Sequence, residues 1–191
     1  MKRMLTALLT LTLLSGCGGG TQEAETLLGR FAAAESCDME AELRCEWETE
    51  QRCYTLHCLW QPEGESRVTV RQPEELAGLS AVFDGRSCAL VYEDQVLDAG
   101  TLGGSGLSPA EVLPRLMEAL RTGWLLEESR EERNGETLLR LTLETEEDGV
   151  KQYWTVWLRA DGTPAAAEVT VKEKLIFRGE FTSFSFGAIL S

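Results

Sequence analysis

The sequence contains a single histidine, His57, among its 191 residues. Histidine is the side chain that most often transfers protons in catalysis, and His57 falls on the polar side of an alternating segment, beside Thr55. A thiol nucleophile such as Cys88 would depend on His57 as its base. No serine stands in a nucleophile-elbow context, and the many carboxylates form runs rather than an isolated pair. These absences predict a protein that is not an enzyme, with a Cys88–His57 thiol enzyme as the weaker alternative.

Compact metal and phosphate motifs are also missing. Apart from Cys17, the five cysteines lie eight, eight, five and thirty residues apart, which matches no compact zinc pattern. They are Cys37, Cys45, Cys53, Cys58 and Cys88. The glycine-rich segment 100–106 lacks the lysine of a phosphate-binding loop. We therefore expect no metal and no cofactor.

The odd number of these cysteines leaves at least one thiol free even where disulfides form. Alternation of apolar and polar residues places Cys45 and Cys58 on the apolar sides of two successive predicted strands, and Cys53 on the polar side. Cys45 and Cys58 are therefore the candidate disulfide pair. They would lie directly opposite each other only if the turn between the strands consists of residues 50–53.

No apolar run reaches the roughly 20 residues that a helix needs to span a bilayer. The longest near the N-terminus covers residues 4–14, about 11 residues, with three threonines as its only polar members. It follows Lys2 and Arg3 and precedes the small residues Ser15 and Gly16, which is the order of a secretory signal peptide. Residues 1–16 are therefore predicted to be a cleaved export signal.

The motif Leu14-Ser15-Gly16-Cys17 resembles the lipobox of bacterial lipoproteins, in which the cysteine becomes acylated. Fatty acyl chains on Cys17, such as palmitate, would anchor the mature protein stably in a membrane. Three glycines follow and form a flexible tether. We expect residues 17–23 to be the lipidated cysteine with its tether and residues 24–191 to be one domain. The predicted location is the extracytoplasmic face of the cell membrane.

Basic residues are scarce: 18 Lys and Arg stand against 32 Asp and Glu. The export signal carries Lys2 and Arg3 and no acidic residue, so without it the balance is 16 against 32, a net charge near −16. Such a surface repels phosphate backbones and anionic head groups. Nucleic acid is therefore an unfavourable partner, and the lipid must provide the attachment to the membrane.

Strict alternation predicts strands that bury one face in a core. It runs through residues 37–47 and again through residues 53–60, and shorter strands are predicted at 67–71, 81–83, 88–92 and 95–97. The last third reads as strands over 124–132, 136–144, 150–159, 163–172 and 175–186. Asn134-Gly135 and Asp161-Gly162 are strong hairpin signals within it.

Two helices are predicted, over residues 21–36 and from Ser108 to Gly123. The second carries a capping box, Ser108 with Glu111, and a proline in its first turn. This order predicts an α+β fold: one curved antiparallel sheet of about 11 strands, a half-open β-barrel, with two helices covering its concave face.

The same order resembles the lipoprotein-carrier family (LolA/LolB-like), which sorts lipoproteins to the outer membrane. The motifs that carry the resemblance are Val82-Phe83-Asp84-Gly85-Arg86, Leu90-Val91-Tyr92, Trp157-Leu158-Arg159, Asp161-Gly162-Thr163-Pro164 and the closing stretch from Gly179 to Phe186. The resemblance implies a half-open barrel whose concave face holds the acyl chains of a lipid or lipoprotein. A tethered chain differs from the free shuttles of that family, and it is also similar to clostridial germination lipoproteins of the GerS type.

Apolar residues of the predicted concave face form the candidate binding surface. On the strands they are Leu43, Trp47, Leu56, Trp60, Val68, Val70 and Phe83, and on the covering helix Leu113, Leu116, Met117 and Leu120. Such a face suits an apolar ligand at a barrel mouth. The same residues are equally compatible with a closed core, because periodicity does not distinguish the two.

Two functions follow from these observations. The first is a membrane-anchored, non-catalytic lipoprotein whose half-barrel binds a lipid or a lipoprotein acyl chain. The second is a surface-tethered protein that binds a basic cell-wall (spore cortex) enzyme through its acidic surface, as the GerS resemblance implies, with no lipid ligand.

Overall fold

The computed structural model describes residues 20–46, 51–84, 87–101 and 107–187. Within these residues the first half of the chain forms six strands: β1 (Cys37–Glu46), β2 (Gln51–Trp60), β3 (Glu65–Gln72), β4 (Ser80–Asp84), β5 (Ser87–Tyr92) and β6 (Gln95–Thr101). The second half forms five: β7 (Trp124–Arg133), β8 (Glu136–Glu147), β9 (Val150–Leu158), β10 (Pro164–Val171) and β11 (Lys174–Phe186). The helices are α1 (Gly20–Ala32), α2 (Pro109–Thr122) and the short 3₁₀-helix η1 (Glu74–Leu76).

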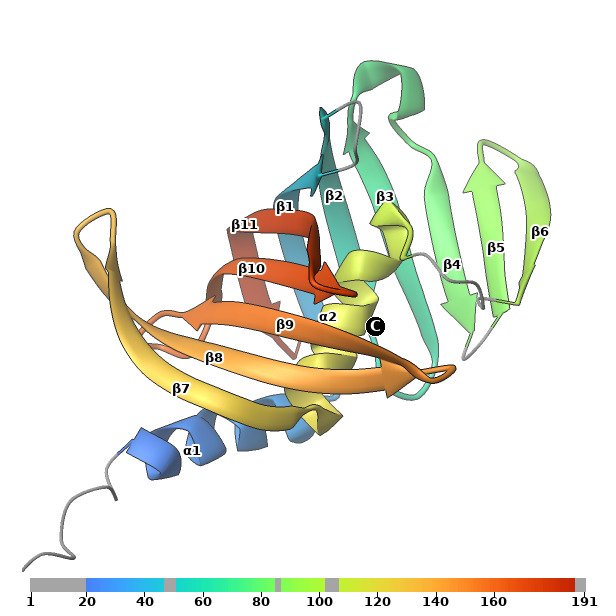
Figure 1. The fold of residues 1–191 in the computed structure, drawn as a ribbon. Coiled ribbons are helices and arrows are strands. Elements are labelled where there is room, and N and C mark those ends of the chain that lie inside the picture. The colour runs from blue at the N-terminus through green and yellow to red at the C-terminus, as the bar shows by residue number, and fades with distance from the viewer. Residues whose placement is uncertain (1–19, 47–50, 85–86, 102–106, 188–191) are drawn as a thin grey trace, which may run out of the picture.

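All eleven described strands belong to one open antiparallel sheet, in the order β6-β5-β4-β3-β2-β1-β11-β10-β9-β8-β7. Each half of the chain is a meander, and the halves join where β1 pairs with β11. The sheet curves into a half-barrel, with α1 across its lower end and β4–β6 extending to the right as a wing (Figure 1). The predicted fold class, a single curved antiparallel sheet with two helices, is confirmed.

The topology explains why α2 lies in the concave face. Strands β6 and β7 are the two edges of the sheet, and α2 is the element between them in the chain. The chain must therefore cross the open side of the half-barrel, and it does so as a helix (Figure 1). The predicted capping box is present: the Ser108 backbone N–H donates to Glu111 Oε2 at 2.9 Å. At the other end the Gly123 N–H donates to the Ala119 carbonyl oxygen at 2.9 Å.

One hydrophobic core fills the space between α2 and the sheet. It includes the inward residues of β1, which follow the predicted alternation from Cys37 to Cys45, and large side chains from the second half such as Trp154 and Phe177. Phe31 ties α1 to this core through its ring contacts with Phe184 and Phe186. Among the described residues, the members of this core lie between Ala24 and Phe186.

The first helix begins at Gly20, one residue before its predicted start at residue 21, and it ends at Ala32 rather than at Ser36. Residues 20–23, which fall within the predicted tether 17–23, are therefore part of the helix. Residues 33–36 favour helix by composition, but the chain must turn there to enter β1 at Cys37. Packing of the Phe31 side chain in the core therefore outweighs the local propensity of these residues.

The β1–β2 register separates the cysteines predicted as a disulfide pair. Cys45 lies opposite Arg52, and Cys58 lies opposite Met39. Cys45 and Met39 are six residues apart, about 20 Å along the strand at roughly 3.3 Å per residue. That separation is far beyond the reach of a disulfide, and both thiols are free and buried. The Cys45–Cys58 prediction is therefore wrong in this register.

Candidate functional site

Most of the predicted concave-face residues are packed together. Nine of them are buried in the core cluster, and Val70 is partly buried against it. Leu43, Leu113 and Leu116 surround a remaining void of only about 10 Å³. Trp47 lies outside the described residues. Under α2, the apolar face is therefore a filled core, and its role as a ligand surface remains a prediction.

A cleft of about 270 Å³ opens beside α2, where the helix meets the β2–β3 hairpin. It is lined by Trp60, Gln61, Pro62, Gly64, Ser66, Phe83, Glu111, Pro114, Arg115 and Glu118. The α2 residues are spaced so that they share one side of the helix. Of the predicted surface residues, Trp60 and Phe83 reach this cleft. The cleft's volume lies just below the range of about 300–1,000 Å³ that is usual for ligand pockets.

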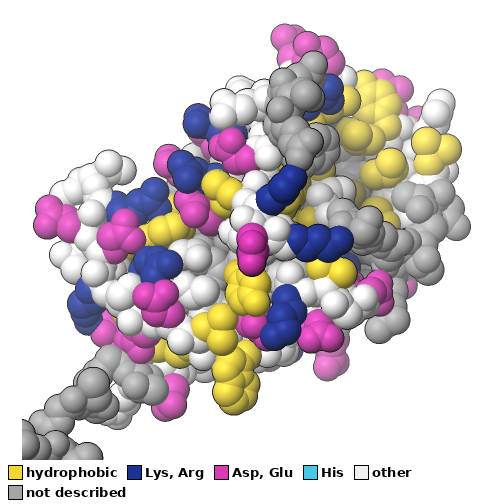
Figure 2. Space-filling model, viewed as in Figure 1, with side chains coloured by type: hydrophobic (Ala, Val, Ile, Leu, Met, Phe, Trp, Pro, Cys, Tyr) yellow, Lys and Arg dark blue, Asp and Glu magenta, His cyan; other side chains and the backbone are white. Residues whose placement is uncertain are grey.

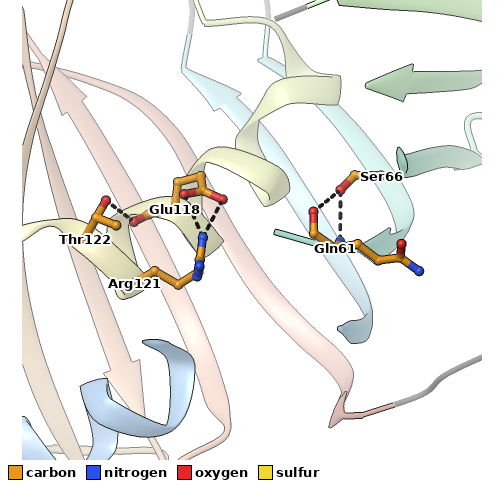
Figure 3. Close-up of polar contacts among 5 residues, drawn as sticks. All are labelled: Gln61, Ser66, Glu118, Arg121 and Thr122. Atoms are coloured by element: carbon orange, nitrogen blue, oxygen red, sulfur yellow. Dashed lines mark hydrogen bonds and ion pairs between the residues drawn. The ribbon is translucent and has the colours of Figure 1, made fainter. Parts of the chain in front are cut away.

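The hairpin wall of the cleft is held by a buried serine. Ser66 Oγ accepts a hydrogen bond from the Gln61 backbone N–H at 3.0 Å and donates one to the Gln61 carbonyl oxygen at 3.1 Å. Figure 3 shows this pair on one side and Glu118, Arg121 and Thr122 of α2 on the other. The turn is thereby fixed without using a residue of α2.

An apolar row of side chains runs beside the cleft across seven strands. In antiparallel pairs, residues directly opposite each other point to the same face. The pairing places seven residues in line: Phe184, Met39, Cys58, Val68, Ala81, Leu90 and Leu97. We call this line the apolar row. Phe83 of the cleft is two residues from Ala81 on the same strand and shares its face.

The apolar row passes from the core to the surface. Met39, Cys58, Val68 and Ala81 are buried, Leu90 is partly exposed, and 64% of Leu97 is exposed. Hydrophobic side chains gather over the wing at the right of Figure 2. α2 packs against β2, β3 and β8, so the outer part of the row extends beyond the helix. The concave face is thus closed under α2 and apolar but exposed on the wing.

Ionised side chains meet in two groups along α2 at the cleft. Arg115 Nη1 lies 2.6 Å from Glu147 Oε1, and its Nη2 lies 3.6 Å from Glu111 Oε1. Arg121 Nη1 lies 3.4 Å from both carboxylate oxygens of Glu118. The polar rim of the cleft therefore contains both signs of charge.

The residues of the alternative thiol enzyme do not meet. Cys88 is buried on the concave face of β5, opposite Phe83, and burial raises the pKa of its thiol. His57 lies on the opposite face of the sheet, opposite Glu40, and contacts Asp38 Oδ1 through Nε2 at 2.8 Å. The sheet therefore separates the buried, protonated thiol of Cys88 from His57, so His57 cannot act as its base. This geometry gives the Cys88–His57 hypothesis no support.

The described residues contain neither a metal-binding cluster nor a membrane-spanning helix. No group of three or more His, Cys, Asp or Glu side chains there is arranged to hold a metal ion. None of the helices in that part of the chain is both long and apolar enough to cross a membrane.

Sequence reasoning missed the polar rim of the cleft and the outer end of the apolar row. Arg115 and Glu118 stand in a helix with an evident apolar stripe, and nothing in the sequence marks them as facing a cavity. Leu90 and Leu97 lie in predicted strands, so their face could have been read from alternation. Their exposure depends on where α2 crosses the sheet, which alternation does not give.

Comparison with known proteins gives structural neighbours only. No family model matches the chain, and no curated relative matches it. A DUF1329 family protein from Desulfovibrio piger is 14% identical, with a TM-score of 0.53 over 91% of this chain and 96% of that one. This similarity shows the fold.

Two further solved structures are similar over the same extent. A LolA superfamily protein from Nitrosomonas europaea is 12% identical with a TM-score of 0.48, covering 90% of this chain and 96% of that one. A putative outer membrane lipoprotein-sorting protein domain from Vibrio parahaemolyticus is 10% identical with a TM-score of 0.49, covering 90% and 92%. The open eleven-stranded half-barrel with its two helices is the arrangement that was predicted from the sequence.

Proposed function

We propose that this protein is a membrane-anchored, non-catalytic lipoprotein that binds an apolar ligand, a lipid or the acyl chain of a lipoprotein, on the concave face of its half-barrel. The observation that carries the proposal is the apolar row, which leaves the core and continues to exposed Leu97 beside an open cleft. A soluble domain with no ligand gains nothing by exposing such a row.

The free energy expected from covering these apolar side chains suits reversible binding of the ligand. Covering a side chain such as Leu97 contributes up to about 1.5–3 kcal/mol when burial is complete. Several contacts along Leu90, Leu97 and the apolar walls of the cleft would together hold one chain. Deeper entry requires α2 to lift from the sheet and to expose its own Leu116 and Met117, both fully buried, which costs the packing of that helix.

The site is proposed to act at the extracytoplasmic face of the cell membrane, where acyl groups on Cys17 hold the chain. Two residues separate Cys17 from the described part of the chain, which begins at Gly20 in α1. A tether of this length keeps the start of α1 within about 10 Å of Cys17, at roughly 3.5 Å per residue. Labelling cells with a palmitate analogue tests the anchor: the label should be lost in Cys17→Ala and kept in Cys53→Ala.

Uptake of an apolar fluorophore tests the binding site. The chain starting at Gly18 is the material, because it contains every described residue of the core, from Ala24 onward. Leu97→Ser should weaken uptake several-fold, whereas Val96→Ser should leave it unchanged. The two residues are neighbours on β6 with 64% and 67% of their surfaces exposed, but alternation points them to opposite faces.

Both variants should unfold at the wild-type denaturant concentration, because surface substitutions usually change stability by less than about 0.5 kcal/mol. Absence of uptake by the wild-type chain would reject the proposed function. Equal loss of uptake in Leu97→Ser and Val96→Ser would place the ligand elsewhere than on the apolar row.

A second candidate is the tethered partner of a basic cell-wall enzyme. Edge strand β7 favours it, because its sequence is rich in glutamate and its first residue, Trp124, is 74% exposed. A partner could cover Trp124 and pair with the acidic strand. The test is co-purification from native envelopes at low and high salt: a partner retained by the wild type, released by salt and absent from Trp124→Ser would support this candidate.

A further inference from the structure

We propose that the cleft binds the cationic end of the apolar ligand, an ammonium head group, while the ligand's tail lies along the apolar row. The proposal rests on the proposed function and names the ligand class. The cleft and the row adjoin at Phe83 and Ala81, so one amphiphile can reach both.

Among the described residues that line the cleft, the cationic side chain is Arg115, and it is already paired. Arg115 contacts Glu147 at 2.6 Å and Glu111 at 3.6 Å, so its guanidinium is shared between two carboxylates. An anionic head group would have to displace one of these partners, and it would approach Glu111 and Glu118 as it did so. Like-charge repulsion therefore disfavours phosphate or sulfate heads in the cleft.

Glu118 is the carboxylate with capacity left for a ligand. Its contacts with Arg121 are both 3.4 Å long, beyond the usual range of about 2.7–2.9 Å for charge-assisted hydrogen bonds. The side chain of Glu118 is 44% exposed and lines the cleft. An ammonium group in the cleft could approach this carboxylate without breaking a short ion pair.

One cationic side chain of the protein already lies between an aromatic ring and a carboxylate, as the proposal requires of the ligand. The guanidinium of Arg121 lies 5.5 Å from the centre of the Trp60 ring. The same guanidinium contacts Glu118 (Figure 3). A tryptophan face together with a carboxylate is a favourable setting for a cation. Trp60 also lines the cleft, with Phe83 beside it, so a ligand cation meets the same two kinds of group.

The size of the cleft agrees with a head group rather than a whole lipid. Its volume is about 270 Å³, and the void under α2 is only about 10 Å³. A long chain must therefore lie outside the cleft. The exposed end of the apolar row at Leu90 and Leu97 is the adjoining apolar surface.

Competition among three amphiphiles of equal chain length tests the assignment. Decylammonium, decanol and decyl sulfate are added below their micelle-forming concentrations to the chain starting at Gly18 with its apolar fluorophore bound. Decylammonium should displace the fluorophore at about a tenfold lower concentration than decanol, a gain of the size expected for a cation held by an aromatic ring and a carboxylate. Decyl sulfate should be the weakest competitor.

Glu118→Gln should reduce the preference for decylammonium to less than about threefold while decanol binds as before, since only the charge-dependent contact is lost. Glu75→Gln is the matched control. Glu75 is exposed on η1, which follows the end of β3 away from the cleft, and the same one charge is removed. The preference of the Glu75→Gln variant for decylammonium over decanol should equal that of the wild type.

The outcomes separate the two proposals. If none of the three compounds displaces the fluorophore, the proposed function fails. If decanol and decylammonium compete equally, or if decyl sulfate is best, the head-group assignment is wrong and the apolar site stands. If Glu118→Gln keeps the full preference for decylammonium, the preference arises from the net negative charge of the protein and not from the cleft. That result would also overturn the assignment.

Discussion

Gly179 on β11 lies directly opposite Leu43 on β1, and a Cβ atom on Gly179 would stand 2.7 Å from Leu43 Cδ2. Leu43 is 2% exposed, and the void beside it is only about 10 Å³. The contact lies at the join between the two halves of the sheet, since β1 and β11 are the strands that connect them. The absence of a side chain at Gly179 therefore lets the core close over the join.

Gly179→Ala should destabilise the domain by about 1–3 kcal/mol, the usual cost of overpacking a core. The measurement is equilibrium unfolding in urea. Gly29→Ala is the control: Gly29 lies in α1 with nothing within 4 Å of an added Cβ, so stability should stay equal or rise by up to about 1 kcal/mol. A Gly179→Ala protein as stable as the wild type would mean that the join is looser than the structure shows.

Thiol accessibility follows from the burial of the cysteines. Cys53 is exposed, whereas Cys37, Cys45, Cys58 and Cys88 are buried. Burial raises the pKa of Cys37 and of Cys45 to about 12, so these thiols stay protonated and unreactive at neutral pH. In the chain starting at Gly18, a thiol reagent should label one cysteine rapidly in the native state and five after unfolding without reductant. Three labelled cysteines after unfolding would instead reveal a disulfide.

Alternation predicted which face each β1 residue occupies, but not which residue of β2 it meets. Shifting the pairing by an even number of residues leaves every side chain on its face. The expected Cys45–Cys58 pairing and the observed Cys45–Arg52 pairing differ by six residues, so the sequence pattern fits both. The register depends on the turn and on the core as a whole.

Local signals were more reliable where the chemistry is local. Ser108 and Glu111 cap α2 as their spacing predicted, and Asn134 and Gly135 both adopt the positive φ angles that their hairpin turn requires. The cleft could not be predicted in this way. Trp60 and Glu118 are far apart in sequence and meet only because α2 crosses the sheet at that position.

Shortening a buried side chain of α2 tests whether the concave face is closed or open. Leu116 is 1% exposed in the core between α2 and the sheet, so Leu116→Ala should cost about 2–5 kcal/mol in the free energy of unfolding. Leu126→Ala is the control, because Leu126 is among the exposed hydrophobic residues of β7 and its loss should cost less than about 0.5 kcal/mol. Equal small effects for both variants would show that α2 rests loosely on the sheet and that the concave face is open without a ligand.

The edge of the sheet beside α1 contains a carboxyl group that is disfavoured in its charged form. Partial burial and the nearby Glu23 raise the pKa of Glu128, although Arg130 acts in the opposite direction. A carboxyl whose pKa is raised by folding destabilises the folded state when it is ionised, and this penalty disappears below the unfolded pKa of about 4.3. The stability contributed by the protonated form is therefore lost as the pH rises through the folded pKa.

Glu128→Gln should accordingly stabilise the domain at neutral pH by about 0.2–1 kcal/mol, the scale of partly exposed charge interactions. The advantage over wild type should shrink as the pH falls toward the ordinary glutamate pKa, because the wild-type carboxyl becomes neutral too. Urea unfolding of both proteins across this pH range measures the difference, and Glu132→Gln on the same strand, where Glu132 is exposed, should give no comparable change. If the extra stability of Glu128→Gln over the wild type grows as the pH falls, the raised pKa of Glu128 is contradicted. The stabilisation would then come from contacts of the new amide group.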